Sequence, residues 1–198
     1  MAKFWNSRTT VTTGIVVTLL GAFYIYQSPT PLTFSMSSSP PSNGISDLEF
    51  KLTQVSRSPP VLLVTLKNTS PDTPYTLLKW GTPLDSAALN TGVFSISEKE
   101  SGDEVQQFVL EINRKMPPPR EELVTVAPGT QEEIEVSFDK PWMPEGKPAT
   151  YKVKAEGQLL GVWNRYGSDI TEDELYAYAE SPLHGKKFQT NEVLMEVH

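Results

Sequence analysis

Short runs in which apolar and polar residues alternate dominate the chain from about residue 47 onward. Leu48, Phe50 and Leu52 alternate with charged or polar neighbours, which is the pattern of a strand with one buried face. The run 61–66 is apolar on both faces for most of its length and is typical of a central strand. The same reasoning predicts further strands at residues 75–80, 93–100, 105–112, 122–126, 133–138, 149–155 and 192–197.

Clusters of Pro, Gly, Asn and Ser separate these apolar runs, and such residues form turns. The clearest clusters are residues 57–60, 68–74, 101–103, 117–119 and 128–129. Many short strands joined by turns at this spacing indicate two packed antiparallel sheets. The sequence therefore predicts an all-β fold, an immunoglobulin-like antiparallel β-sandwich, in a single domain over residues 47–198.

One segment, residues 168–179, departs from the strand pattern. Thr171 is followed three residues later by Glu174, the spacing of a helical capping box. Acidic side chains in the first turn also complement the positive end of a helix dipole. We expect one short helix inserted before the last strand.

The N-terminus has the pattern of a targeting element. Lys3 and Arg8 precede an uncharged run of 16 residues, 11–26, and the next charged residue is Asp47. This arrangement keeps the first residues in the cytosol and sends the rest of the chain across the membrane. The run is longer than most signal-peptide cores and shorter than a full membrane span of about 20 residues.

Residues 1–26 are therefore predicted to be a signal peptide or an N-terminal membrane anchor, and the pattern leaves both open. Residues 27–46 are rich in Ser and Pro and predict a linker without a core of its own. The expected location is extracytoplasmic, with the protein either secreted or anchored by a single N-terminal helix.

The charge and the cysteine content exclude several classes of function and partner. The 198-residue chain has no Cys, so it contains no disulfide, thiolate nucleophile or Cys-bound metal. The net charge is −7, and beyond residue 36 there are 15 basic and 24 acidic side chains. A surface this acidic repels phosphate backbones, which argues against nucleic acid as a partner.

Three blocks carry a family resemblance: Leu77–Asp85, Asn113–Pro119 and Val126–Gly129. In this order and spacing they resemble the non-catalytic β-sandwich domain that precedes the catalytic domain of deuterolysin-like (aspzincin) zinc metallopeptidases. The resemblance covers roughly residues 47–156, and the chain has no His-Glu-x-x-His zinc motif.

The resemblance implies a non-catalytic binding module related to a pro-region, which can assist the folding of a peptidase or restrain it. The expected partner is a metallopeptidase or another extracellular protein. A stalked structural surface domain without a specific enzyme partner is the alternative, and an unrecognised hydrolase or metal protein ranks last.

Three residues are candidates for partner binding. Trp80 could anchor a partner, although a Trp that ends a strand more often fills the core while its N–H finds one acceptor. Arg114 and Lys115 form a cationic spot before three prolines and could contact an acidic partner. The alternative for that segment is an edge strand that ends at a proline stop.

Asn68 begins an Asn-Thr-Ser sequence, which is a candidate glycosylation site on the extracytoplasmic side of a eukaryotic membrane. The alternative is an Asn that forms the turn after the central strand.

No residue is predicted to be catalytic, to bind a cofactor or to bind a metal. His184 and His198 are the only histidines, and neither has a second ligand four residues away. The acidic cluster Asp169–Glu174 superficially resembles a calcium loop, but a Glu occupies the sixth position, where that loop needs Gly. Helix capping explains this cluster better.

Overall fold

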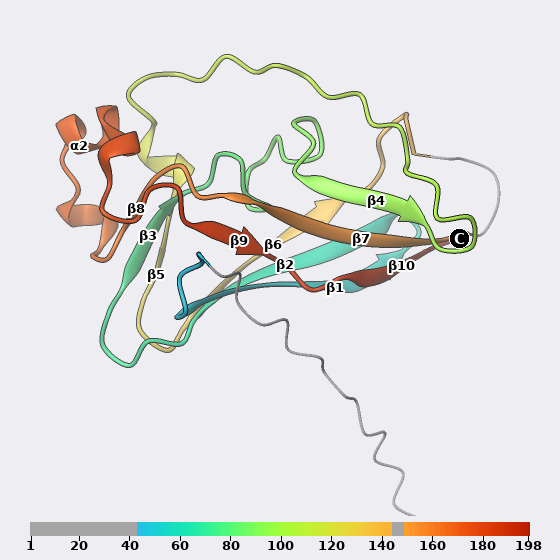
Figure 1. Ribbon diagram of the computed structural model, residues 1–198, viewed down its shortest axis with the longest axis horizontal. Helices are drawn as coiled ribbons and strands as arrows, with labels where there is room; N and C mark the ends of the chain where they lie inside the picture. Colours follow the sequence, from blue (N-terminus) through green and yellow to red (C-terminus); the bar gives the residue numbers. More distant parts are fainter. Residues whose placement is uncertain (1–42, 144–148) are drawn as a thin grey trace, which may run out of the picture. The chain divides into compact units, whose positions relative to one another are not determined.

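The computed structural model describes residues 43–143 and 149–198, which fold as a sheet-rich body with one short α-helix (Figure 1). The predicted signal peptide or anchor and residues 27–42 of the predicted linker lie outside the described residues. Within the described part, no helix has the length and apolar character needed to cross a membrane.

The first sheet contains three antiparallel strands in the order β1-β2-β6. Strand β1 covers Leu48–Arg57, β2 covers Pro60–Asn68 and β6 covers Gln131–Ser137. Strand β2 lies between the other two, and every second residue of it is fully buried. This position explains its nearly continuous apolar sequence.

The second sheet is built around β7 (Ala149–Gln158), the longest strand in it. Strand β4 (Phe94–Glu98) pairs with one edge of β7. Strands β9 (Lys187–Gln189) and β10 (Val193–Val197) pair with different parts of β7. All of these pairs are antiparallel.

The apolar faces of these two sheets form most of the main core, to which Leu77, Val126 and Val162 also belong. Phe50 of β1 packs against Phe188 of β9, with ring centroids 5.1 Å apart. The core includes alternate residues of the strands, as the period of two requires. Its buried members include Leu52, Leu62, Val64, Leu66, Phe94, Ile96, Phe138, Tyr151, Val153, Ala155 and Met195.

A third, smaller sheet has the order β5-β3-β8. It consists of β3 (Tyr75–Leu78), β5 (Leu123–Val126) and β8 (Val162–Trp163). Beside it lie the 3-10 turns η1 (Arg120–Glu122), η2 (Gly167–Asp169) and η3 (Tyr178–Glu180). A satellite core of Trp163, Ile170 and Leu175 lies at this end of the domain.

The predicted short helix is confirmed as α2 (Glu172–Tyr176), with the capping box complete. The Thr171 N–H donates to Glu174 Oε2 at 2.9 Å, and the Glu174 N–H donates to Thr171 Oγ1 at 3.3 Å. The Thr171 N–H and then the Arg165 guanidinium lower the pKa of the Glu174 carboxyl. These contacts also account for the acidic cluster that resembles a calcium loop.

The prediction of a strand at residues 105–112 is wrong. No regular strand forms in this segment, which is an irregular stretch of chain after β4. Strands β8 and β9 were not predicted, because runs of two and three residues are too short to show a periodic pattern. The other predicted strands are present, with ends that differ by a few residues.

Candidate functional site

The segment Val105–Met116, which we name the strap, runs back along the edge of β4 and then toward η1. Figure 1 shows it as the yellow-green line that arches along the upper edge of the domain. Three hydrogen bonds tie its first half to the body of the domain. They join Val105 N to Ile96 O (2.9 Å), Gln107 Nε2 to Phe94 O (2.8 Å) and Leu110 N to Asn90 O (2.7 Å).

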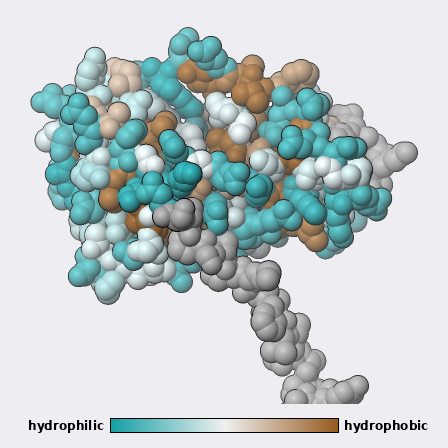
Figure 2. All heavy atoms as spheres, in the orientation of Figure 1, coloured by the Kyte–Doolittle hydropathy of each residue, from teal (hydrophilic) through white to brown (hydrophobic). Residues whose placement is uncertain are grey.

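The middle of the strap exposes three consecutive apolar side chains. Phe108 is 72% exposed, Val109 62% and Leu110 56%. Figure 2, in the same orientation, shows hydrophobic residues gathered along this edge. Val109 also contacts Gly92, where an added Cβ would lie 3.1 Å from the Val109 side chain. Gly92 has φ +72°, so both the backbone and the space favour glycine there.

The second half of the strap is fixed by a buried ion pair. Arg114 donates to both carboxylate oxygens of Asp85, at 2.6 Å from Nη2 and 3.3 Å from Nη1. The Asp85 side chain is fully buried, and that of Arg114 is 24% exposed. A two-point contact of this kind fixes both the position and the orientation of the guanidinium.

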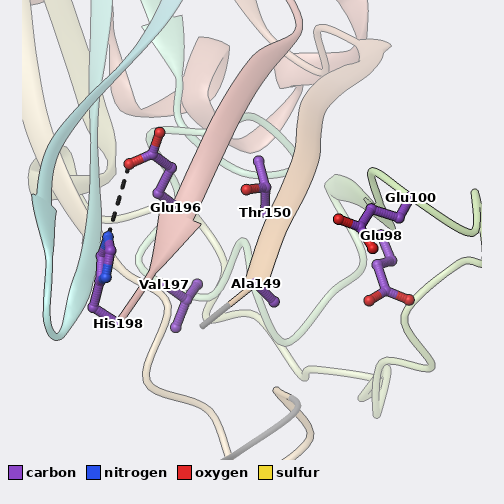
Figure 3. Close-up of a pocket in the computed structure, with 7 residues that line it drawn as sticks. All are labelled: Glu98, Glu100, Ala149, Thr150, Glu196, Val197 and His198. Atoms are coloured by element: carbon purple, nitrogen blue, oxygen red, sulfur yellow. Dashed lines mark ion pairs between the residues drawn. The ribbon is translucent and has the colours of Figure 1, made fainter. Parts of the chain in front are cut away.

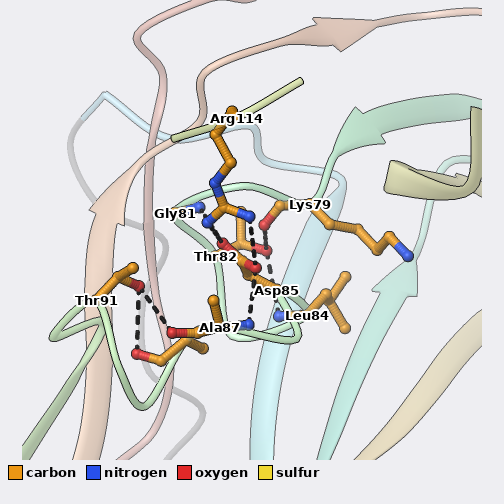
Figure 4. Close-up of polar contacts among 9 residues, drawn as sticks. Lys79, Gly81, Thr82, Leu84, Asp85, Ala87, Thr91 and Arg114 are labelled. Carbon is orange, nitrogen blue, oxygen red and sulfur yellow. Dashed lines mark hydrogen bonds and ion pairs between the residues drawn. The ribbon is translucent and has the colours of Figure 1, made fainter. Parts of the chain in front are cut away.

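The loop after β3 is folded around Asp85 (Figure 4). The carboxylate accepts hydrogen bonds from Gly81 N at 3.2 Å and from Ala87 N at 2.9 Å. Thr82 shapes the same loop, because its hydroxyl donates to Lys79 O at 2.7 Å. Asp85 therefore has its oxygens occupied by the loop and by Arg114, which offsets the cost of burying a charge.

Trp80 lies under this ion pair. The guanidinium carbon of Arg114 is 5.3 Å from the centroid of the Trp80 ring, and the ring of Tyr178 meets Trp80 edge-on at 5.9 Å. Trp80 is only 4% exposed. Its indole N–H is buried and has no hydrogen-bond partner among the described residues. We name Trp80, Asp85 and Arg114 the anchor.

An open cleft of about 440 Å³ lies beside the anchor. Met116 of the strap, Leu160 and Tyr178 contribute apolar surface to it, and Arg114 and Glu156 contribute charge. Arg114 and Met116 of the strap line the cleft, and the exposed apolar run lies earlier in the same segment, so we treat the cleft, the anchor and the run together as the candidate interaction site.

Comparison with known proteins decides the family. Residues 47–197 match the family model of the immunoglobulin-like domain, which is about three quarters of the chain. The chain belongs to the immunoglobulin-like domain family. The matched range contains every strand of the sandwich, so the family and the observed fold agree.

One relative of this immunoglobulin-like domain is an uncharacterized secreted protein of Arthroderma benhamiae. The two are 30% identical over 117 residues, which is 58% of each chain. The match thus spans little more than half of the relative. Neither match bears on the resemblance to deuterolysin-like peptidases, which stays a prediction.

The structure brings two of the three predicted partner-binding residues together. Trp80 and Arg114 are in contact, and Trp80 lies in the interior, as the alternative interpretation expected. The hydrogen-bond acceptor expected for its N–H is not found among the described residues. Lys115 is exposed and makes no salt bridge within the described part of the chain. Whether these residues bind a partner stays a prediction.

The structure favours the turn-forming role of Asn68 over glycosylation. Asn68 is fully buried, and its Nδ2 donates to Thr73 O at 2.8 Å and to Val126 O at 3.0 Å. Its side-chain oxygen accepts from Ser70 N at 2.9 Å. A glycan would be attached at the same Nδ2, so a glycan could not coexist with these contacts in the folded domain.

Neither histidine lines the cleft beside the anchor. His184 Nδ1 is 2.6 Å from Leu160 O. His198 Nε2 is 3.8 Å from Glu196 in a small hollow of about 200 Å³ that also includes Glu98 and Glu100 (Figure 3). Within residues 43–143 and 149–198, no three His, Asp or Glu side chains lie in a group that could hold a metal ion.

Sequence reasoning missed Asp85 and the exposed run Phe108–Leu110. Asp85 is the single acidic residue in the segment 81–89, whose other residues are small or apolar, and this pattern could have indicated a buried carboxylate. The nearest cation in the sequence is Lys79, whereas the observed partner is Arg114, so the pairing needed the fold. The exposed run carried no distinguishing signal, since its composition is that of a strand.

Proposed function

We propose that this immunoglobulin-like domain is a non-catalytic, extracytoplasmic binding module that contacts another extracellular protein through the strap. The observation that supports this proposal is the exposed run Phe108–Leu110, held in place by the buried Asp85–Arg114 pair. The first partner to test is a zinc endopeptidase of the deuterolysin kind, as the family resemblance implies.

The physical argument concerns the cost of binding. Apolar surface gains about 25 cal/mol for each Å² that a partner removes from water. A loose loop would lose much of that gain on becoming ordered. The strap is already tied at Val105, Leu110 and Arg114, so a partner would meet a preorganised surface.

Two observations support the extracytoplasmic location. The relative from Arthroderma benhamiae is described as secreted. The N-terminal sequence, with Lys3 and Arg8 ahead of an uncharged run, has the order of a targeting segment. Fractionation of a producing culture distinguishes a secreted protein from an anchored one, since the first is recovered from the medium and the second from membranes.

The decisive experiment is a pull-down with the purified protein and a zinc endopeptidase at micromolar concentration, followed by an inhibition assay. The test variant replaces Phe108, Val109 and Leu110 with Ser. The matched control replaces Val55 and Leu194 with Ser, because these residues expose similar apolar side chains on β1 and β10.

We expect the parent protein and the control variant to retain the peptidase and the strap variant to lose it. Equal retention by all three proteins would contradict binding through the strap. No retention by any of them would contradict a peptidase partner and would favour the alternative, a structural surface domain. Metal analysis and a His184→Ala variant test the proposed absence of catalysis.

A further inference from the structure

We propose that the strap is a site of limited proteolysis in the folded domain. An endopeptidase that prefers large apolar side chains would cut after Phe108 or after Leu110. This modification site goes beyond the proposed function, because a cut requires only a brief encounter and no stable partner.

The backbone of the strap is largely free to pair with an endopeptidase cleft. Such clefts bind the chain extended and pair with its N–H and C=O groups as a neighbouring strand would. From Gln106 to Met116 only the N–H of Leu110 has a backbone partner in the described part of the chain. A peptidase can therefore pair with this backbone without first opening a sheet or a helix.

The side chains of the strap provide the specificity. Phe108 and Leu110 are the large apolar residues that a hydrophobic specificity pocket takes. Both point their surface to solvent, at 72% and 56% exposure. Elsewhere in the described chain, Tyr176 is 67% exposed and Tyr166 46%, but Tyr176 ends the hydrogen-bonded helix α2 and the Tyr166 carbonyl is bonded to Asp169 N at the start of η2. The strap thus combines exposure with a free backbone, and Tyr176 has exposure alone.

The basic residues of the strap are a weaker site. The guanidinium of Arg114 would have to leave both oxygens of Asp85 and the face of Trp80 to enter a pocket for basic side chains. Lys115 is exposed, but it is followed by Met116 and three prolines, which restrict the chain on that side of the bond.

The reaction is ordinary peptide hydrolysis. Water adds to the carbonyl carbon, the C–N bond breaks, and a proton passes to the new amine, which leaves one carboxylate and one ammonium end. The part before the cut remains tied through Val105 and Gln107, and the part after it through Arg114. The nicked domain should therefore keep its fold as two associated chains.

The test is digestion of the purified folded protein with a trace of chymotrypsin, with the cuts located by mass spectrometry. Within residues 43–143 and 149–198, we expect the first cut after Phe108 or Leu110, ahead of any cut at Tyr176. The far-ultraviolet circular dichroism spectrum should be unchanged when the strap is fully cut. A first cut elsewhere in these residues would overturn the proposal.

Matched variants show whether cleavage of the strap depends on its apolar side chains or only on its accessible backbone. A protein with Phe108→Ser and Leu110→Ser should be cut in the strap at about one tenth of the parent rate or more slowly, because the open backbone remains but the preferred side chains are gone. Tyr176→Ser should leave the rate of the first cut unchanged. An unchanged rate for the strap variant would contradict the site, whatever the pull-down shows about a stable partner.

Discussion

Strand β2 and the strap have similar sequences and opposite environments. Val61–Leu66 and Val105–Ile112 are both rich in apolar and β-branched residues, and both are predicted as strands. Strand β2 has a hydrogen-bonded neighbour on each side, β1 and β6, and buries Leu62, Val64 and Leu66 completely. The strap has no strand paired along it and exposes Phe108, Val109 and Leu110.

In this domain an apolar run forms a strand where a neighbouring strand completes its hydrogen bonds, as β1 and β6 do for β2. After Val105, the strap is hydrogen-bonded to the body through the Gln107 side chain, which bonds to Phe94 O, and through Leu110 N, which bonds to Asn90 O, before Arg114 is reached. These separate contacts do not form a ladder of paired strands. Separate hydrogen bonds in its first half and the Asp85–Arg114 pair in its second half keep the strap near the body. Its apolar residues are consequently available to other molecules.

The largest expected effect is the difference in stability loss between a substitution in β2 and one in the strap. Leu66→Ala in β2 should lower the free energy of unfolding by about 2–5 kcal/mol, since it opens a cavity in a fully packed core. Leu110→Ala in the strap should change it by about 0.5 kcal/mol or less, as exposed sites do. Urea denaturation of both variants measures the difference, and similar losses would contradict the assigned environments.

The next effect tests how the strap is held. Asp85→Ala leaves the partly buried Arg114 without its partner and frees the N–H groups of Gly81 and Ala87. We expect a loss of about 2–3 kcal/mol in the free energy of unfolding, toward the lower end of the range for buried pairs because Arg114 keeps some contact with water.

A double-mutant cycle with Arg114→Met isolates the pair itself. The cycle should give a coupling free energy of about 1–3 kcal/mol between Asp85 and Arg114. Additive losses in the double variant would show that Arg114 does not hold the strap through Asp85.

A smaller loss is expected at the end of β2. Asn68→Ala removes a buried amide that bonds to the backbone of Thr73, Val126 and Ser70, and should cost about 1–3 kcal/mol. Mass spectrometry of protein from a eukaryotic host gives the second readout. We expect no glycan on Asn68 in the folded protein, and a fully glycosylated, equally stable protein would contradict its buried position.

The sequence was sufficient for the elements whose signals are local. Alternation at Leu48, Phe50 and Leu52 predicted β1, and the spacing of Thr171 and Glu174 predicted the capped helix α2. These features depend on neighbours in the chain, so no tertiary information was needed.

The parts that could not be predicted depend on contacts between distant residues. Asp85 and Arg114 are 29 residues apart, and no local pattern shows that one neutralises the other. The strap also required knowledge of which strands occupy the edges of the sheets. The same limit applies to Trp80, whose burial was expected but whose unpartnered N–H was not.

The smallest effect concerns α2, which like the strap is held by side chains. Because the folded-state pKa of Glu174 is lowered from about 4.5, its ionised form stabilises the folded state above that pH. This stabilisation is lost as the pH falls through the folded-state pKa. Glu174→Gln should therefore melt at a lower temperature than the parent at neutral pH, and the gap should close below about pH 4.5.

Thermal unfolding followed by circular dichroism over about pH 3–7 measures this gap. Asp173→Asn is the matched control, since Asp173 lies in the same helical turn and makes no side-chain hydrogen bond in the described residues. A gap that is equally large at both ends of the pH range would contradict the role of the Glu174 carboxylate.

Amide hydrogen exchange tests the central contrast most directly. We expect the amides of Gln106–Val109 and Glu111–Met116 to exchange at nearly the rate of a free peptide, while Val105, Leu110 and the paired amides of β2 are protected. Protection across the whole strap equal to that of β2 would show that its backbone is already paired, and would contradict an open segment available to a partner or a peptidase.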